Sequence, residues 1–214
     1  MTEISVDNEN KYFIEESLKH NVEVLYCRNF FSSIAKELYE ILDKEINWEI
    51  FPVKVMGKIF NQPRDSSYVG DDQRPYKYGG FDRVPKKWTP MLKNVRDCLQ
   101  KVVNNINPEH PPLNAVLCNR YKTGNEYIGP HSDAEDDLFK DAFIVSVSLG
   151  SERDFIFHDI KEKTTHKILL KNGSIVLMGK NCQKNYKHSL PKRMGVKEPR
   201  INLTFRSIIG RNFV

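Results

Sequence analysis

The sequence has few features of secreted, membrane-spanning or zinc-ribbon proteins. It contains four cysteines, Cys27, Cys98, Cys118 and Cys182, and no two of them form a CxxC pair. This scatter argues against a disulfide framework and against a zinc ribbon. No apolar run approaches the roughly 20 residues that cross a bilayer, and the N-terminus is polar rather than basic and then apolar. We therefore expect a soluble, intracellular protein with free thiols and no membrane contact.

Low-complexity segments and internal repeats are also absent, so the composition indicates an ordinary globular chain. Hydrophobic residues make up 39% and charged residues 29% of the 214 positions, which suits one buried domain and is short for two. Residues 1–25 are polar and predict an extension with little to bury. We expect residues 26–214 to form a single domain, with helices in 26–113 and most strands in 114–214.

Positive charge is concentrated in two stretches rather than spread evenly. Residues 180–206 contain eight lysines and arginines against a single acid, Glu198, and residues 54–87 hold a second basic set among tyrosines. Basic side chains interleaved with aromatic ones suit phosphate contact and base stacking. A solvated lysine-rich face would have the same composition, so charge alone does not decide between the two.

Two helices are expected in the first half of the chain. Residues from Ser32 to about Lys44 carry apolar side chains at the spacing of one helix face. A second helix is expected to begin with Thr89 as its N-cap and Pro90 in its first turn. Between the helices, residues 48–88 are interrupted by glycine and proline, which predicts hairpins and long loops.

From residue 115 onward the apolar pattern changes to a period of two, which is typical of strands. The expected strands are Ala115–Tyr121, Phe143–Leu149, Asp154–His158, His166–Lys171, Ser174–Met178, Tyr186–Leu190 and Ile201–Ile209. Several short strands joined by turns favour an antiparallel sandwich or barrel. The predicted fold class is α+β, with N-terminal helices packed on a double-stranded β-helix (jelly-roll) barrel.

The strand near the C-terminus has an unusually polar face. In residues 200–206 the odd positions are apolar, and the even positions are Arg200, Asn202, Thr204 and Arg206. Alternate side chains of a strand point to opposite faces. The polar face could line a barrel interior where two guanidinium groups bind a small dicarboxylate. An exposed strand with its polar face in water would show the same alternation.

A metal site is indicated by His131 and Asp133, which lie on the same side of an extended backbone. A second imidazole could come from His188, in a predicted strand. Two histidines and one carboxylate form the facial triad of non-haem iron oxygenases, although zinc uses similar ligands. Paired arginines that bind a carboxylate favour the oxygenase, and Asn119 and Tyr121 add hydrogen-bonding groups on one strand face. The four other histidines are expected at the surface or in packing.

The order of these residues resembles the AlkB family of Fe(II)/2-oxoglutarate dioxygenases. The string PRINLTFR at Pro199–Arg206 is similar to the family signature, and HSLP at His188–Pro191 matches what precedes it. Similarity continues through Asn119–Glu135 and Ser146–Phe157, and the resemblance covers most of residues 53–209. Within the family, it is greatest to members that act on double-stranded DNA.

The resemblance implies roles for the site residues. Fe(II) would be held by the catalytic residues His131, Asp133 and His188. The co-substrate 2-oxoglutarate would be held by Arg200 at its distal carboxylate, with Asn119 and Tyr121, and by Arg206, Asn202 and Thr204 toward its metal-bound end. The second co-substrate, O2, would be activated at the iron. Hydroxylation of a methyl group on the base would then give a hemiaminal, which decomposes to formaldehyde and the repaired base.

The resemblance also implies nucleic-acid contacts, because the damaged base must leave the stack to reach the metal. Tyr76 and Tyr78, in the nucleotide-recognition lid of residues 26–113, resemble the aromatic residues that sandwich the base against His131. Glu135 resembles a residue that contacts the polar edge of the base.

Three further contacts with the duplex follow from the resemblance. Val55, Met56 and Gly57 resemble the hydrophobic finger that fills the gap in the duplex, with Met56 in place of a phenylalanine. Methionine can wedge between base pairs, but it stacks less well. Arg64 and the pair Lys192 and Arg193 are expected to contact phosphates.

The sequence therefore predicts an oxidative demethylase that repairs N-alkylated bases of the 1-methyladenine and 3-methylcytosine type in DNA. We expect duplex DNA as the substrate, Fe(II), O2 and 2-oxoglutarate as cofactor and co-substrates, and formaldehyde and succinate as products. The expected protein is a monomer, nuclear if its source is eukaryotic. The alternatives are the same chemistry on RNA or single-stranded DNA, a non-catalytic nucleic-acid-binding relative, or a protein hydroxylase.

Overall fold

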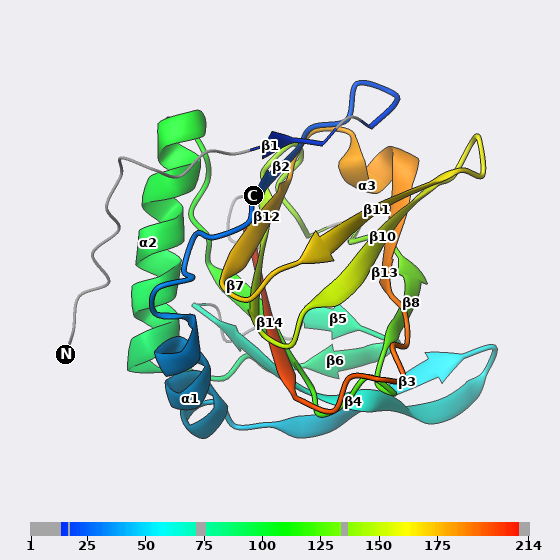
Figure 1. Cartoon of the computed structure of the whole chain (residues 1–214). Coiled ribbons are helices and arrows are strands. Elements are labelled where there is room, and N and C mark those ends of the chain that lie inside the picture. Colours follow the sequence, from blue (N-terminus) through cyan, green and yellow to red (C-terminus); the bar gives the residue numbers. More distant parts are fainter. Residues whose placement is uncertain (1–13, 17, 72–75, 134–136, 210–214) are drawn as a thin grey trace.

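The structure is a computed structural model that describes residues 14–16, 18–71, 76–133 and 137–209. It consists of a large antiparallel sheet that faces a smaller one, with two helices on the outer side of the large sheet (Figure 1). The large sheet has eight strands, in the order β1-β2-β12-β9-β14-β7-β4-β3. The small sheet has four, in the order β11-β10-β13-β8. Two facing antiparallel sheets of this kind form the expected jelly roll.

The large sheet draws its strands from the whole length of the described chain. Its strands are β1 (Ile14–Glu15), β2 (Val24–Cys27), β3 (Glu49–Val55), β4 (Lys58–Gly70), β7 (Ala115–Tyr121), β9 (Ile144–Gly150), β12 (Ser174–Met178) and β14 (Arg200–Arg206). The small sheet contains β8 (Ile128–His131), β10 (Arg153–Asp159), β11 (Thr165–Leu170) and β13 (Tyr186–Leu190). A separate hairpin joins β5 (Tyr76–Tyr78) and β6 (Phe81–Arg83).

Apolar side chains form one core on each side of the large sheet. Leu42 and Leu99, from the two outer helices, pack in one cluster with Val145 and Leu203 of the large sheet. Phe157, from the small sheet, packs in the other cluster with partners that include Tyr26 and Val176 of the large sheet. In β14 the odd positions 201, 203 and 205 belong to the helix-side core. The polar even positions therefore face the space between the sheets.

The two outer helices are α1 (Ala35–Glu45) and α2 (Pro90–Ile106), and a short α3 (Cys182–Asn185) precedes β13. The start of α2 is as predicted: the Thr89 hydroxyl accepts a hydrogen bond from the Leu92 amide, and Pro90 occupies the first turn. Helix α1 begins three residues later than expected from Ser32, because residues 29–34 form turns instead. No helix in the described part of the chain is long and apolar enough to cross a membrane.

The N-terminal segment differs from the expected extension. Strands β1 and β2 pair with each other, and β2 also pairs with β12 of the large sheet. Val22 and Val24 are buried in the core between the sheets. The boundary predicted at residue 25 is therefore wrong, because alternate apolar residues in an otherwise polar segment are enough to bury one face of an edge strand.

The region from residue 48 to 88 is more regular than its glycines and prolines predict. Strands β3 and β4 form a long hairpin whose tip is the turn at Met56 and Gly57, both of which have positive φ angles, 48° and 80°. Positive φ at both central residues matches the twist of a tight hairpin. The outer part of β4 is exposed, whereas its part from residue 64 to 70 is buried in the large sheet beside β7.

Candidate active site

A pocket between the two sheets contains all the residues that the sequence assigned to metal and co-substrate. It encloses about 490 Å³, including its open mouth. Those lining residues are Asn119, Tyr121, His131, Asp133, His188, Arg200, Asn202, Thr204 and Arg206. They come from β7 and β14 of the large sheet and from β8 and β13 of the small sheet, which faces it. Asp133 lies just beyond β8. Apolar walls are added by Ile128, Phe155, Met178 and Leu190, among others.

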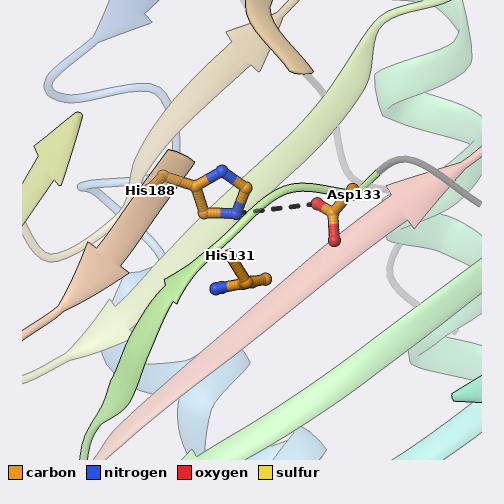
Figure 2. A group of neighbouring side chains, drawn as sticks. All are labelled: His131, Asp133 and His188. Carbon is orange, nitrogen blue, oxygen red and sulfur yellow. Dashed lines mark ion pairs between the residues drawn. The ribbon is translucent and has the colours of Figure 1, made fainter. Parts of the chain in front are cut away.

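His131, Asp133 and His188, which all line the pocket, lie close together (Figure 2). One potential ligand atom from each lies within 4.8 Å of the others. Strands β8 and β13 pair with His131 opposite His188, so strand register brings together two residues that are far apart in sequence. Asp133 lies two positions beyond His131, and its Oδ2 is 3.7 Å from His188 Nε2. This arrangement fits a single divalent cation held on one face.

The protonation states in the triad suit a cation. Burial raises the pKa of Asp133, but the positive Arg206, together with His188 and His131, more than offsets this effect and lowers the pKa to about 2. Burial lowers the pKa of His188 to about 3. Near neutral pH the carboxylate is therefore ionised and the His188 imidazole is neutral, as metal ligation requires.

Hydrogen bonds around the triad orient its members. His131 Nδ1 lies 2.9 Å from the Gly129 carbonyl oxygen, which makes Nδ1 the donor and leaves Nε2 free to bind a metal. Gln183, on α3, accepts a hydrogen bond from the Asp133 amide at 2.9 Å. Arg206 Nη2 donates to Asp133 Oδ1 at 2.7 Å. No pattern in the sequence pointed to Gln183, because only folding places α3 beside Asp133.

Arg200 lies in the same pocket as a buried cation that no acidic side chain neutralises in the described part of the chain. It is 2% exposed, and burial lowers its pKa to about 10. Its Nη2 donates to the Ser148 hydroxyl at 3.0 Å. Within the described residues its Nε has no hydrogen-bond partner and no carboxylate lies within ion-pair distance. An uncompensated buried charge is costly, so Arg200 fits a ligand that brings a carboxylate.

The remaining polar residues of β14 are largely engaged with the protein. Asn202 Nδ2 donates to the Ser146 hydroxyl at 2.8 Å, and the Thr204 hydroxyl donates to Asn202 Oδ1 at 3.1 Å. Arg206 contacts the metal end through Asp133. The two arginines of the strand are therefore not equivalent. Arg206 pairs with the Asp133 carboxylate, whereas Arg200 has no carboxylate partner among the described residues.

Asn119 is held in one orientation by two donors behind it. Its Oδ1 accepts hydrogen bonds from Arg64 Nε at 2.9 Å and from the Ser66 hydroxyl at 2.8 Å. A guanidinium can only donate, so the amide oxygen must face Arg64 and the amide NH2 is left for other acceptors. Asn119 also lines the pocket, where it is therefore suited to donate to a bound anion.

Arg64, which the resemblance assigned to phosphate contact, is buried and bonded within the protein in this structure. Arg64 is 5% exposed, and besides Asn119 it donates to the Tyr127 carbonyl at 3.3 Å. The basic, tyrosine-rich stretch suggested a surface residue. Sheet pairing overrides that pattern, because the inner part of β4 lies next to β7 and points this side chain toward Asn119.

The residues expected to contact nucleic acid are only partly described. The side chains of Val55, Tyr76 and Tyr78, and all of Glu135, lie outside the described residues. The backbone of Tyr76 and Tyr78 forms β5, paired with β6.

Four of the expected contact residues are exposed, and one of them is Gly57 in the turn between β3 and β4. Met56, at the hairpin tip, is 99% exposed. Lys192 and Arg193 are also exposed, in the segment between β13 and β14.

The four other histidines are bonded within the protein, in line with the sequence expectation of surface or packing roles. Each has a hydrogen-bonding partner: His20 with Asp159, His110 with Phe143 and Pro111, His158 with Ser189, and His166 with Glu16.

This combination of a jelly roll, a two-histidine, one-carboxylate triad and an adjacent buried arginine defines the class of 2-oxoglutarate-dependent iron oxygenases. Comparison with known proteins agrees, since the profile of the 2OG-Fe(II) oxygenase superfamily matches residues 23–206. The chain belongs to this superfamily and, within it, to the family of AlkB homologues.

Three relatives illustrate the second assignment. The DNA oxidative demethylase ALKBH2 of Homo sapiens is 35% identical over 195 residues, which span 86% of this chain and 72% of the relative. The Arabidopsis thaliana ALKBH2 is 29% identical, over 90% of this chain and 68% of the relative. The alpha-ketoglutarate-dependent dioxygenase alkB homolog 3 of Bos taurus is 28% identical, over 95% and 72%.

A solved structure of OsALKBH1 has the same fold. It superimposes with a TM-score of 0.60 at 18% identity and covers 91% of this chain and 100% of its own. The superfamily uses Fe(II) and 2-oxoglutarate with O2, and the observed pocket fits both bound groups: a ready cation site at one end and an unneutralised arginine as the carboxylate partner.

Proposed function

We propose that this protein is an oxidative demethylase that removes alkyl groups from N-alkylated bases in DNA, of the 1-methyladenine and 3-methylcytosine type. The single observation that carries the proposal is one pocket that holds both the triad and the buried, unneutralised Arg200. The similarity to DNA oxidative demethylases supports nucleic acid, rather than protein, as the substrate class.

The residues of the chain divide the work within the pocket. His131, Asp133 and His188 bind Fe(II), and Arg200 pairs with the distal carboxylate of 2-oxoglutarate, with Asn119 and Tyr121 beside it. Arg206 keeps Asp133 ionised and oriented. Asn202 and Thr204 add polar groups to the pocket lining on β14. When bound, iron, 2-oxoglutarate and O2 would supply the oxidation of the N-methyl group; one oxygen atom enters the methyl group and the other enters succinate, and the products are succinate, CO2, formaldehyde and the repaired base. The apolar walls exclude water from the site.

Met56, Lys192 and Arg193, which are proposed to contact the duplex, are not among the residues that line the pocket. A base inside a duplex must be flipped out before it can reach the triad. Met56, at the tip of the β3–β4 hairpin, acts as an apolar wedge in the duplex, flanked by Val55 and Gly57. Lys192 and Arg193 contact the phosphate backbone.

Three further side chains are assigned to the flipped base. Tyr76 and Tyr78 stack on it, and Glu135 contacts its polar edge. The exposed hairpin favours duplex DNA over single strands. We further propose that the protein acts as a monomer, and in the nucleus if its source is eukaryotic.

The test is formaldehyde release in the presence of Fe(II) and 2-oxoglutarate. Matched oligonucleotides with a single 1-methyladenine or 3-methylcytosine are compared as single-stranded DNA, double-stranded DNA and RNA. We expect release from DNA, with the duplex as the better substrate. Preferred turnover of RNA would change the substrate class, and release from none of the three substrates would overturn the proposal.

A further inference from the structure

The basic segment, defined here as residues 191–199, joins β13 to β14 and is not part of either sheet. Lys192, Arg193 and Lys197 are exposed on it. An unpaired segment of this length would ordinarily sample many conformations. Its contacts with the turn that follows β7 instead fix its path.

Gly124, in the turn between β7 and β8, forms two backbone hydrogen bonds with the basic segment. Its amide donates to the Val196 carbonyl at 2.9 Å, and its carbonyl accepts a hydrogen bond from the Arg193 amide at 2.8 Å. A Cβ atom at position 124 would lie 1.8 Å from the Arg193 carbonyl oxygen. Glycine is therefore required for the two backbones to approach this closely.

Arg153 connects the same two segments through hydrogen bonds from its buried guanidinium. It is 1% exposed, and its Nη2 donates to the carbonyls of Glu126 at 2.9 Å and Pro191 at 2.6 Å. Nη1 lies 3.4 Å from the carbonyl of Thr123, in the same turn. No acidic side chain pairs with this buried cation in the described part of the chain, and burial lowers its pKa. Burial of a charge is costly. The hydrogen bonds that Arg153 donates to two segments at once offset this cost and join the segments to each other.

The clamp, defined as Gly124 and Arg153, also adjoins the co-substrate pocket. The Tyr121 ring lies 5.9 Å from the Arg153 guanidinium carbon and 5.4 Å from that of Arg200. Lys192 Nζ lies 5.1 Å from the centre of the Tyr127 ring, on the clamped turn. The basic segment is therefore fixed relative to the pocket.

We propose that Gly124 and Arg153 are positioning residues that hold the basic segment as a preformed surface for the sugar–phosphate backbone of the nucleic acid. This inference rests on the proposed function. A loop already held in place loses less conformational entropy when it binds, so Lys192 and Arg193 contact phosphate without first being ordered. Neither positioning residue touches the reacting atoms.

Gly124→Ala tests the clamp, because the new Cβ must displace the backbone of Arg193. The substitution removes no charge. Gly195→Ala is the matched control: it lies in the same segment, and a Cβ atom added there would meet nothing within 4 Å. The probe is a DNA duplex with one 1-methyladenine. Measured quantities are its Kd at salt concentrations from about 50 to about 300 mM, the KM for this DNA, the KM for 2-oxoglutarate and the melting temperature.

We expect Gly124→Ala to weaken DNA binding about tenfold and to flatten the slope of log Kd against log salt by up to about 1.8, or about 0.9 for each lost phosphate contact. The KM for DNA rises, whereas the KM for 2-oxoglutarate stays at its wild-type value. Gly195→Ala keeps the wild-type slope. Arg153→Lys, which keeps the charge but cannot span three carbonyls, is expected to change the slope in the same direction.

Several outcomes separate this inference from the proposed function. Wild-type salt slopes in both Gly124→Ala and Arg153→Lys, with both variants folded, would overturn the clamp. Equal losses in Gly124→Ala and Gly195→Ala would also overturn it. A wild-type protein that binds DNA in a salt-dependent manner but releases no formaldehyde would overturn the proposed function, and the slopes of the variants would still decide the clamp. Wild-type binding that does not depend on salt would exclude a phosphate-binding surface.

Discussion

The pocket between the sheets and the exposed surface that is proposed to contact nucleic acid are built in opposite ways. In the pocket, Arg200 is 2% and Asp133 4% exposed, and strand register fixes their positions. On the surface, Met56 is 99% exposed at a hairpin tip, and Lys192 lies on a segment outside both sheets. The difference indicates that strand register fixes the chemical site, whereas local contacts of loops and hairpin tips, which tolerate sequence change, hold the nucleic-acid surface.

This contrast predicts that the two functions separate by mutation. A change in the pocket should affect iron, co-substrate or turnover while leaving DNA affinity intact. A change on the surface should affect the binding or turnover of DNA while leaving the binding of iron and 2-oxoglutarate intact. The clamp of Gly124 and Arg153 is the place where the two regions meet.

The largest effect is expected for His131→Ala, which removes one of the metal ligands. Turnover should fall to background because the cation site is left incomplete, while the affinity for unmethylated duplex DNA stays within about twofold of wild type because the residue makes no proposed phosphate contact. Formaldehyde release and DNA binding check this outcome, with His158→Ala as the control histidine. Demethylation by the His131 variant would refute the metal assignment.

The next effect is expected for Arg200→Ala, which removes the partner of the distal carboxylate. A buried charged pair contributes about 2–5 kcal/mol, so the KM for 2-oxoglutarate should rise at least about 30-fold. Arg200→Lys should recover only part of this loss, since an ammonium cannot form the bidentate pair. An unchanged KM in Arg200→Ala would show that this arginine is not the carboxylate partner.

A smaller effect is expected for Arg64→Ala, and it locates the boundary between the two regions. Loss of a hydrogen bond to Asn119 that contributes about 1 kcal/mol should raise the KM for 2-oxoglutarate about fivefold. The salt dependence of DNA binding should not change, because Arg64 is buried against Asn119. Titration of binding against salt checks this point; a flatter slope would return Arg64 to the phosphate contacts. Ser66→Ala should reproduce the co-substrate effect alone.

The smallest effect is expected at the hairpin tip. Met56→Phe should improve turnover of duplex DNA by up to about fivefold, because an aromatic ring stacks better on bases than a thioether, and Met56→Ser should reduce it by a similar factor. Single-stranded DNA should be turned over at the wild-type rate by both variants, since no gap in a duplex needs to be filled. Equal effects on both substrates would exclude a wedge.

Local patterns in the sequence were enough to predict much of the fold. Strands β7, β12 and β13 have the expected bounds, and α2 begins at the expected Thr89 and Pro90. These elements carry strong local signals: an N-cap followed by proline, or alternation that buries one face. The burial of Val22, Val24 and Arg64 was not predicted, because it depends on which strand lies next to the segment.

The sequence by itself determined which chemical groups are present: the spacing of His131 and Asp133, and the polar face of residues 200–206, are properties of consecutive residues. Only the tertiary structure decided which groups meet. The pairing of β8 with β13 brings His188 to His131, and the pairing of β4 with β7 sets Ser66 opposite Asn119 and brings Arg64 within reach of it. The physical reason is that strand register joins residues far apart in the chain through backbone hydrogen bonds, which carry no signal in the local sequence.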